Sequence, residues 1–286
     1  MFDSNYETIL ADTERGRALH RKIRYHVYCL ERHFEDPAAF PNGEEYDVWD
    51  IHAVHFMVRH RATATWVAAA RLVLPETFQF PVETLQCLTP EPSAQRPPRR
   101  ELAEISRICI INTPAPWQIN PHLDYTFGHA GRSSESGILL GIFRALMVYS
   151  LRRDIEYCYL LVSHAFARLL RRLGFILHAV GDPIEHRGSR TPYQMRLRET
   201  AKSLLTRSTQ FRGLFNQRDL AYQPFSALDD VWHIDSELMP PSFDWPRTPE
   251  TARRSEIPLS VPSHPGVWHM EAERSRPGPG VWRSVT

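Results

Sequence analysis

Residues 157–180 read YCYLLVSHAFARLLRRLGFILHAV, and this stretch decides the fold class. The apolar run 157–162 predicts a buried strand. Ser163 is a natural N-cap, and the apolar periodicity that follows predicts a helix over 164–173. Gly174 stops that helix, because glycine readily adopts the left-handed conformation at a helix end. A strand that feeds directly into a capped helix is typical of α/β proteins.

The same alternation continues on both sides of this stretch. Strands are predicted at 103–111, 175–180 and 190–197, and an apolar helix is predicted at 136–151. The segment from 103 onward therefore has the order strand, helix, strand, helix, strand, which favours one sheet with helices packed on it.

The N-terminal part predicts one helix and two strands. The helix starts with Asp12 or Thr13 as N-cap and runs to about Leu30. The strands follow at 52–58 and 66–74. Taken together, residues 1–198 are expected to form one mixed α/β (α+β) domain.

The C-terminal part has a different composition. Residues 199–238 are expected to form a helical, basic extension, and residues 239–286 a Pro-rich flexible tail. A segment dominated by Pro, Ser, Arg and Gly cannot bury enough apolar surface to offset the entropy of ordering it. The tail should therefore be dispensable for the fold, although its three tryptophans leave short docking contacts open as an alternative.

Composition excludes several function classes. The chain has 286 residues, 42% hydrophobic, with a formal net charge of +1, so its charge gives no case for nucleic acid or an anionic membrane. Its four cysteines form no Cys-x-x-Cys pair and its histidines no metal-binding spacing, so no metal site is expected.

The N-terminus lacks the pattern of a signal peptide. The longest apolar run, 137–151, is interrupted by Arg144 and falls short of the ~20 residues of a membrane span, so we expect a cytoplasmic protein without a membrane span.

The stretch 104–111, EISRICII, carries the strongest chemical signal. Glu104 begins a strand that is otherwise built for burial, where a carboxylate is costly unless it is paired or functional. The period of two places Glu104, Ser106, Ile108 and Ile110 on one face. Amide formation from a thioester needs a group that accepts a proton from the attacking amine, and Glu104 and Ser106 are candidates, directly or through water. An ion pair between Glu104 and an arginine is an equally open alternative.

The long loop 112–133 precedes the apolar helix, and loops of this length are often functional. Free N–H groups at a helix start bind phosphate, and the pantetheine arm of a carrier thioester bears one. Ser134, Ser136 and Gly137 are therefore candidates for binding the acyl donor. An ordinary Ser-capped helix is the alternative.

Carboxylates and arginines suggest two further sites. Asp47 and Asp50 flank a tryptophan just before a strand, where they are placed to hold a cationic amine, and Arg71 is a candidate ion-pair partner; a solvated acidic loop is the alternative. The helix over 164–173 carries three arginines that would steer an acidic acyl carrier protein toward the site. These are Arg168, Arg171 and Arg172, and a solvated helix face is the alternative reading.

In this order the motifs resemble those of the N-acyl-homoserine lactone (autoinducer) synthases and the N-acyl amino acid synthases, which share the Gcn5-related N-acetyltransferase (GNAT) fold. The resemblance runs from about Tyr6 to Tyr193. It rests on Arg24 and Tyr28 of the first helix, Phe34 after it, Asp47 and Asp50, Arg71-Leu72, Glu104-Ile105-Ser106-Arg107-Ile108, and the two helical runs beginning at Gly137 and Ser163. Ile108 stands where these families have phenylalanine.

The resemblance implies roles for these positions. It implies that Glu104, Ser106 and Arg107 act in catalysis. It implies that the acceptor is bound by Arg24, Tyr28, Phe34, Asp47, Asp50 and Arg71. The thioester would lie between two splayed strands, along Ile108, Cys109 and Ile110. No tightly bound cofactor is implied.

A narrower resemblance concerns the acyltransferases associated with the PEP-CTERM/exosortase system. Residues 25–31, YHVYCLE, and 181–193, GDPIEHRGSRTPY, carry it. The main hypothesis is an N-acyltransferase that moves a fatty acyl group from an acyl carrier protein to a small amine, an amino acid among the candidates.

Three alternatives remain open. One is a homoserine lactone synthase that uses S-adenosylmethionine. Another is an acetyl- or acyl-CoA-dependent N-acetyltransferase; the short glycine-containing phosphate loop of such enzymes is missing after the 103–111 strand, which favours acyl carrier protein, with acyl-CoA still open. The third is a binding partner without catalysis in an exopolysaccharide or exosortase system.

Overall fold

The computed structural model describes residues 2–90, 96–113, 115–118, 132–207 and 226–227. Its centre is a mixed β-sheet with the strand order β6-β8-β5-β4-β3-β2-β1-β9, and β7 pairs with β8 beside this path. The strands are β1 (Tyr6–Leu10), β2 (Ala53–His60), β3 (Trp66–Val73), β4 (Leu102–Ile110), β5 (Tyr157–Val162), β6 (Leu177–Ala179), β7 (Ile184–Glu185), β8 (Ser189–Arg196) and β9 (Ser226–Ala227).

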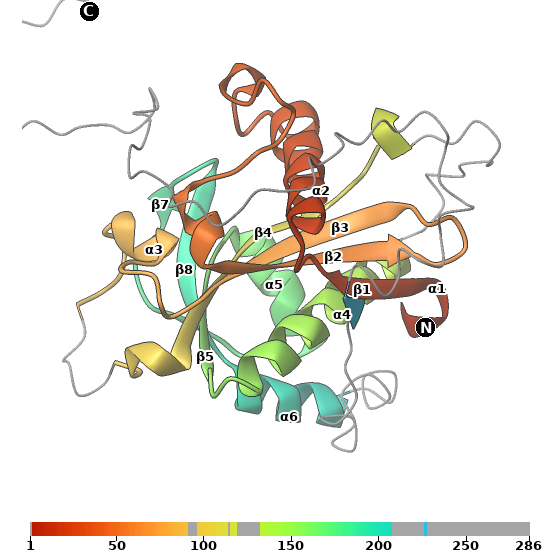
Figure 1. Cartoon of the computed structure of the whole chain (residues 1–286). Helices are drawn as coiled ribbons and strands as arrows, with labels where there is room; N and C mark the ends of the chain where they lie inside the picture. Colours follow the sequence, from red (N-terminus) through yellow and green to blue (C-terminus); the bar gives the residue numbers. More distant parts are fainter. Residues whose placement is uncertain (1, 91–95, 114, 119–131, 208–225, 228–286) are drawn as a thin grey trace, which may run out of the picture. The chain divides into compact units, whose positions relative to one another are not determined.

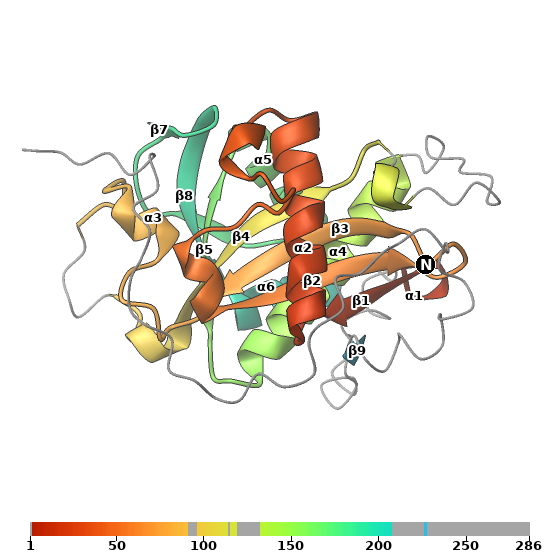
Figure 2. The same ribbon diagram turned by 45° about the horizontal axis from the view of Figure 1, so that its top comes forward.

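Helices lie on both faces of the sheet. The α-helices are α1 (Phe2–Asn5), α2 (Glu14–Tyr25), α3 (Pro81–Thr84), α4 (Arg132–Leu151), α5 (His164–Leu173) and α6 (Leu197–Arg207). Helix α2 crosses β2 and β3 on one face and continues as a π-helix, η1 (His26–Glu31), while α4 packs on the opposite face (Figure 1, Figure 2). Short 3-10 turns include η3 (Val48–His52) and η5 (Arg99–Glu101).

The mixed sheet predicted from the sequence is confirmed. Strands β1 to β4 are antiparallel neighbours, β4 and β5 are parallel, and β8 pairs antiparallel with β5 and β6. The crossover from β4 to β5 contains α4, as a parallel connection requires. The core between α4 and the sheet is apolar, and includes Phe56, Leu72, Ile105 and Phe143.

Helix boundaries agree with the sequence where a cap marks them. Thr13 accepts a hydrogen bond from the Gly16 N–H, and Ser163 accepts one from the Phe166 N–H. Gly174 has φ +107°, the left-handed conformation expected of a helix stop. The predicted start of α4 at residue 136 is wrong, because the helix begins at Arg132. The sequence could not show this, because no side-chain cap pattern marks that start.

Arg144 can lie within the apolar helix α4 because its charge is paired. Its guanidinium donates to both oxygens of the Asp3 carboxylate, with 2.8 Å between Nη1 and Oδ2, and it lies 5.6 Å from the centre of the Phe2 ring. The bidentate pair joins α1 to α4. No helix in the described part of the chain is long and apolar enough to span a membrane.

Part of the domain organisation predicted from the sequence falls on residues that the structure does not describe. The predicted tail, 239–286, and most of the predicted extension, 199–238, lie there, and the loop 112–133 is described only in part. Within the extension, α6 places Thr200 and Leu204 in buried positions. The domain boundary at 198 stays a prediction.

We predict opposite effects for two glycines of α4. Alanine is about 1 kcal/mol more favourable than glycine inside a helix. A Cβ at Gly137 would meet nothing within 4 Å, whereas a Cβ at Gly141 would lie 2.3 Å from atoms of the Phe2 ring. Gly137→Ala should therefore raise the free energy of unfolding by up to about 1 kcal/mol, and Gly141→Ala should lower it by about 1–3 kcal/mol, the cost of overpacking.

Equilibrium denaturation of the two variants measures this difference. Adding Phe2→Ala to Gly141→Ala should remove most of the steric cost, which a double-mutant cycle would report. Equal gains at both glycines would show that Phe2 does not pack where we place it.

Candidate functional site

Glu104 lies where β4 and β5 separate. The two strands pair only from Leu102–Tyr157 to Glu104–Tyr159, although both continue beyond that point. The Glu104 side chain is buried, and its Oε2 accepts a hydrogen bond of 2.8 Å from the Val82 N–H at the start of α3. It makes no salt bridge with any residue that the structure describes, so the alternative of a Glu104–arginine ion pair is not what the fold provides.

Burial raises the pKa of Glu104 to about 8. The Val82 N–H and the positive charge of Arg71 favour the ionised form, but they do not offset the loss of hydration. Glu104 is therefore a carboxyl group that is mostly protonated at neutral pH and can exchange its proton near the pH at which amines react. This is the behaviour that acid–base catalysis requires.

A β-bulge in β4 corrects the predicted face. Arg71 pairs with Ser106 and Ala69 with Cys109, so Arg107 and Ile108 together oppose Ala70. Arg107 has φ +52°, in the left-handed region. The extra residue reverses the alternation, so Cys109, and not Ile108 or Ile110, shares the face of Glu104 and Ser106.

The two isoleucines point the other way. Ile108 and Ile110 pack against the core on the α4 side of the sheet. The prediction that they share a face with Glu104 is therefore wrong. Regular alternation of residue types carries no sign of an inserted residue, so the sequence could not reveal this bulge.

Three arginines and three carboxylates form one buried network beside Glu104. Arg24 of α2 pairs with Glu45 and, at 2.6 Å, with Asp50. Arg71 of β3 pairs with Asp47 and, at 2.9 Å, with Asp50. Arg107 of β4 pairs with Glu45 and Asp47, both at 3.0 Å. Each group contacts two of opposite sign within the network, and Arg107 also lies 3.9 Å from Glu35. The network ties α2, β3 and β4 to the loop around residues 45–50.

The network keeps its carboxylates ionised. Burial alone would raise the pKa of Glu45, but Arg107 and Arg24 lower it to about 2. Burial also opposes ionisation of Asp50, and Arg24 and Arg71 hold its pKa well below its usual range. The loop is further fixed by the Asp47 N–H, which donates to Asp50 Oδ2 at 2.9 Å.

The structure thus brings together the predicted residues Arg24, Asp47, Asp50, Arg71 and Arg107. Glu45 completes the network and was missed as a site residue. In the sequence it resembles its neighbour Glu44, which instead pairs with Arg21 at 2.7 Å on the surface of α2. Only the three-dimensional position separates the two.

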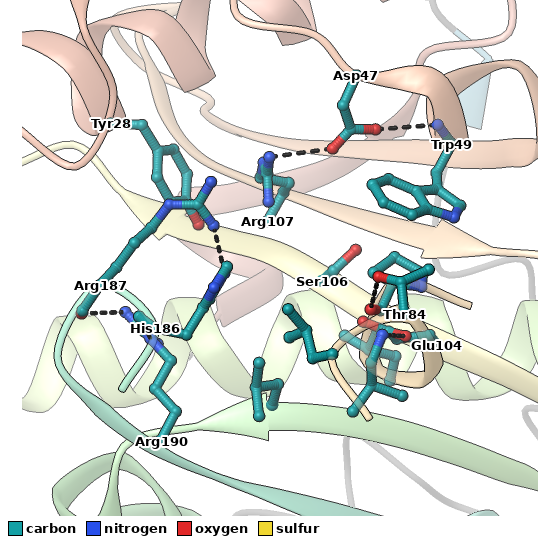
Figure 3. A pocket seen from close by; sticks show the side chains of 15 residues that line it. Tyr28, Asp47, Trp49, Thr84, Glu104, Ser106, Arg107, His186, Arg187 and Arg190 are labelled. Atoms are coloured by element: carbon teal, nitrogen blue, oxygen red, sulfur yellow. Dashed lines mark hydrogen bonds and ion pairs between the residues drawn. The ribbon is translucent and has the colours of Figure 1, made fainter. Parts of the chain in front are cut away.

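Two adjoining cavities open beside Glu104. The first has a volume of about 150 Å³ and is lined by Glu104, Ser106, Arg107, Asp47, Trp49 and Thr84, among others (Figure 3). The second has a volume of about 320 Å³ and continues along the gap between β4 and β5 toward α4 and α5. Both are lined by Tyr28, Ser106, Arg107 and Arg190, so one molecule in each would meet at these side chains.

The predicted aromatic residues lie at this junction. Tyr28 is on η1, and its hydroxyl donates to the Ile108 carbonyl at 3.3 Å. Its ring centre lies 6.2 Å from that of Phe34 and 5.5 Å from the Arg107 guanidinium. A π-helix often marks a functional site, because it rotates the following side chains out of the regular helical register. Burial raises the pKa of Tyr28 to about 12, so it stays protonated.

The predicted donor residues divide into two groups. Ile108, Cys109 and Ile110 line the second cavity. Ser136 and Gly137 do not lie at a helix start, because α4 begins at Arg132 and the free N–H groups belong to its first turn. Of the three predicted residues, only Ser134 is in that turn, and Glu135 beside it lines the second cavity.

The three arginines of α5 lie outside both cavities. Arg168, Arg171 and Arg172 are exposed, whereas Phe166 and Leu169 of the same helix line the second cavity. Arg171 donates to the Leu177 carbonyl at 3.0 Å. These arginines therefore lie at the surface and do not line the proposed acyl cavity; their role in docking a carrier protein stays a prediction.

Several further residues of the first cavity were not predicted. His186, Arg187 and Arg190 reach it from the β7–β8 hairpin, and Trp49 and Thr84 line it opposite them (Figure 3). The hairpin sequence had entered only the narrower resemblance, without a role. Among the described residues, no group of histidine, cysteine and carboxylate side chains is arranged to hold a metal ion.

We predict that two glutamates affect stability with opposite pH dependence. Glu104 has a raised pKa, so the folded state loses stability as the pH rises from about 5 to 8. Glu104→Gln should therefore become more stable than the unchanged protein by about 1.4 kcal/mol per pH unit across that window. Glu45 has a lowered pKa, so its stabilisation is present above about pH 4.5 and is lost as the pH falls toward 2.

Glu45→Gln should accordingly lower the free energy of unfolding at pH 7, by about 3–5 kcal/mol, since it removes one carboxylate partner from each of Arg24 and Arg107 and leaves one positive charge of the network uncompensated. Denaturant titrations between pH 5 and 8.5 measure both variants. A Glu104→Gln variant whose difference from the parent protein does not change with pH would show that Glu104 is not a buried protonated acid.

Comparison with known proteins supports the fold. A model of the acetyltransferase (GNAT) domain family matches residues 23–113. The structure is similar to TofI, solved in a ternary complex with an inhibitor and MTA, at a TM-score of 0.52 and 18% identity over 69% of this chain and 96% of that one. It is similar to the CoA-dependent acyl-homoserine lactone synthase BjaI, solved with SAM and isopentyl-CoA, at a TM-score of 0.51 and 16% identity over 81% and 98% of the two chains.

A more distant similarity is to FeeM, an N-acyl amino acid synthase from uncultured soil microbes, with a TM-score of 0.45 and 13% identity over 70% of this chain and 94% of that one. No curated protein matches the chain. The shared architecture confirms the predicted GNAT-like fold, and the domain match over 23–113 confirms the prediction of an enzyme of the N-acyltransferase class.

Proposed function

We propose that the protein transfers a fatty acyl group directly from a carrier thioester to the nitrogen of a small amine. The amine nitrogen attacks the thioester carbonyl carbon, a C–N bond forms, and the C–S bond breaks. The nitrogen gives one proton to Glu104, and the leaving sulfur takes up a proton and departs as a thiol. No covalent bond to the enzyme is needed.

The observation that carries this proposal is the place of Glu104. A buried carboxyl group without an ion-pair partner among the described residues lies where two parallel strands separate; it lines the first cavity, which shares Ser106 with the second. A thioester that extends along the second cavity and an amine in the first would react at that junction. The pKa of Glu104, raised by burial to about 8, suits a group that must accept a proton from an amine.

Other residues take supporting roles in the proposal. Ser106 shares the face of Glu104 and accepts a hydrogen bond of 3.1 Å from Arg71, so it can relay a proton through water. Arg107 joins the ion network to the junction of the cavities. Backbone N–H groups of β4 beyond Glu104 are no longer paired with β5 and can polarise the thioester carbonyl.

The acceptor would lie in the first cavity, between Tyr28 and Trp49. Arg24, Asp47, Asp50 and Arg71 would act on it indirectly, because their charges are already satisfied by one another. Their role in the proposal is to hold the loop that carries Trp49 against β3 and β4. Phe34 would close the second cavity over the acyl chain.

For the donor, acyl carrier protein and acyl-CoA are both compatible with the second cavity. The relative BjaI was solved with isopentyl-CoA, which supports a thioester of this type. The exposed arginines of α5 favour acyl carrier protein, since it is acidic and would dock on a basic helix. Neither donor is expected to remain tightly bound.

The narrower resemblance places the activity in a cellular setting. We propose a cytoplasmic acyltransferase that serves a PEP-CTERM/exosortase system, on the strength of the motifs at 25–31 and 181–193. A gene neighbourhood without exosortase or PEP-CTERM genes would contradict that assignment and leave the acyl-transfer proposal intact.

We predict that Glu104→Gln lowers turnover by roughly a hundredfold or more, the scale of a lost general base. With the unchanged protein, kcat should rise with pH through a pKa near 8, and that rise should be absent from the variant. Steady-state release of the carrier thiol from an acyl thioester measures both. Glu156→Gln is the control, because Glu156 pairs with Arg198 at the surface and lines neither cavity. Unchanged turnover in a folded Glu104→Gln protein would remove the proposed base.

We predict a different result for the arginines of α5. Arg168→Glu with Arg172→Glu should raise the KM for an acyl carrier protein thioester roughly tenfold at low salt and reduce its salt dependence. The KM for acyl-CoA should not change. Arg100→Glu, at an exposed arginine of η5, serves as control. No effect of the double variant would indicate another docking face.

A further inference from the structure

The β7–β8 hairpin brings three nitrogen-bearing side chains to the first cavity, and the reaction scheme uses none of them. They are His186, Arg187 and Arg190. Arg187 has φ +53° and Gly188 has φ +89°, so the turn places a non-glycine residue in the left-handed region. Non-glycine residues in this conformation are strained, and they cluster at functional sites.

Arg190 has no carboxylate partner among the residues that the structure describes. Its Nε donates to the His186 carbonyl at 2.8 Å, and its Nη2 donates to the Arg187 carbonyl at 3.3 Å. Its guanidinium also lies 5.7 Å from the centre of the Phe34 ring. A guanidinium has five N–H groups, so three remain without a partner among the residues described. The backbone carbonyls and the Phe34 ring orient the group and leave its positive charge uncompensated.

The charged side chains around the cavity include one more arginine than carboxylates with which arginines are paired. Arg187 is paired with Glu35, and the three arginines of the network are paired with their three carboxylates. Five arginines therefore face four ionised carboxylates: Arg24, Arg71, Arg107, Arg187 and Arg190 against Glu35, Glu45, Asp47 and Asp50. With Glu104 protonated, one positive charge is in excess, and it lies at Arg190.

His186 adds no charge to this balance. Burial, together with Arg187 and Arg190, lowers the pKa of His186 to about 4. Its Nε2 is neutral and accepts a hydrogen bond of 2.8 Å from Arg187 Nη1. The imidazole thus positions Arg187, and the two arginines form the cationic side of the cavity opposite Thr84 and Glu104 (Figure 3).

We propose that Arg190, oriented by the β7–β8 hairpin and supported by Arg187, binds a carboxylate on the acceptor, so that the acceptor is an amine bearing a free carboxylate. This inference rests on the proposed acyl transfer. A planar guanidinium with several free N–H groups matches a carboxylate in geometry and charge. One such anion would neutralise the excess charge and leave the amino group free to face Glu104.

A phosphate of the acyl donor is the other anion of suitable chemistry. The pantetheine arm separates that phosphate from the thioester by its whole length, however, and the thioester must lie at the junction beside Glu104. The phosphate would then be outside the first cavity. Arg190 lines both cavities, but His186 and Arg187 beside it line only the first, as Glu104 does, so an anion bound by the two arginines together belongs to the molecule that gives up its proton to Glu104.

Arg190→Gln tests the inference, with Arg100→Gln as control because Arg100 is exposed on η5 and lines neither cavity. Two acceptor mixtures are compared: the standard amino acids, and the same amino acids as carboxamides. Products are read by mass spectrometry with both acyl carrier protein and CoA thioesters as donors. We expect the unchanged protein to prefer the free acids, and Arg190→Gln to raise their KM roughly tenfold to a hundredfold, the range for a lost charged hydrogen bond. The carboxamides and the donor KM should be unaffected.

Equal use of acids and carboxamides by the unchanged protein would overturn the inference while acyl transfer stands. A raised donor KM with an unchanged acceptor KM would assign the anion to the donor phosphate, which also overturns it. Arg187→Gln provides a second variant in case Arg190→Gln fails to fold, with the same expected loss for acids alone.

A binding experiment tests the inference even if the protein transfers no acyl group. If neither mixture is acylated, calorimetry with the same free amino acids and carboxamides still tests the site. Tighter binding of the acids that Arg190→Gln abolishes would support the carboxylate subsite without acyl transfer. Equal binding of acids and carboxamides would overturn it.

Discussion

Strands β4 and β5 pair over only three residues, and the rest of the site depends on that short pairing. A parallel pair that continued would fill the space between the strands with a hydrogen-bond ladder and leave no room for a substrate. The strands part at Glu104. The bulge at Arg107 then bends β4, directs Arg107 toward the ion network, and turns Ile108 and Ile110 toward the α4 side. One irregularity of the sheet thus creates the gap and orders the groups around it.

The ion network holds this irregular strand in place. Buried ion pairs add little net stability when compared with apolar packing, because the loss of hydration offsets most of the attraction between the charges. Their value here is geometric. Arg107 lies at the bulge and Arg71 on the neighbouring strand beside it, and the two share Asp47; Arg24 reaches Glu45 and Asp50 from α2. Glu104 is excluded from these pairs, and that exclusion is what leaves its pKa raised. The network and the unpaired acid are therefore two parts of one arrangement.

Most of the fold and part of the site were predictable from the sequence. The helix over 164–173 and the strand over 157–162 were located because Ser163 and Gly174 mark their boundaries with side-chain and backbone chemistry that acts locally. The residues of the ion network were named through their resemblance to family motifs, and the structure places them together. What failed was nonlocal or irregular. Glu45 became distinct from Glu44 only through its approach to Arg24 and Arg107, and the bulge in β4 left no trace in the alternation. Arg190 could be recognised as a candidate binding residue only from the structure, which places it in the same cavity as Glu104 and gives it no carboxylate partner among the described residues.

The proposed function requires that the protein makes an N-acyl compound in cells and needs Glu104 to do so. Mass spectrometry of lipid extracts from cells that produce the protein, compared with cells that produce Glu104→Gln at equal level, measures this. We expect a species whose mass is that of a fatty acid plus an amine less one water, present with the unchanged protein and absent with the variant. Identical extracts from the two, with or without such a species, would contradict it.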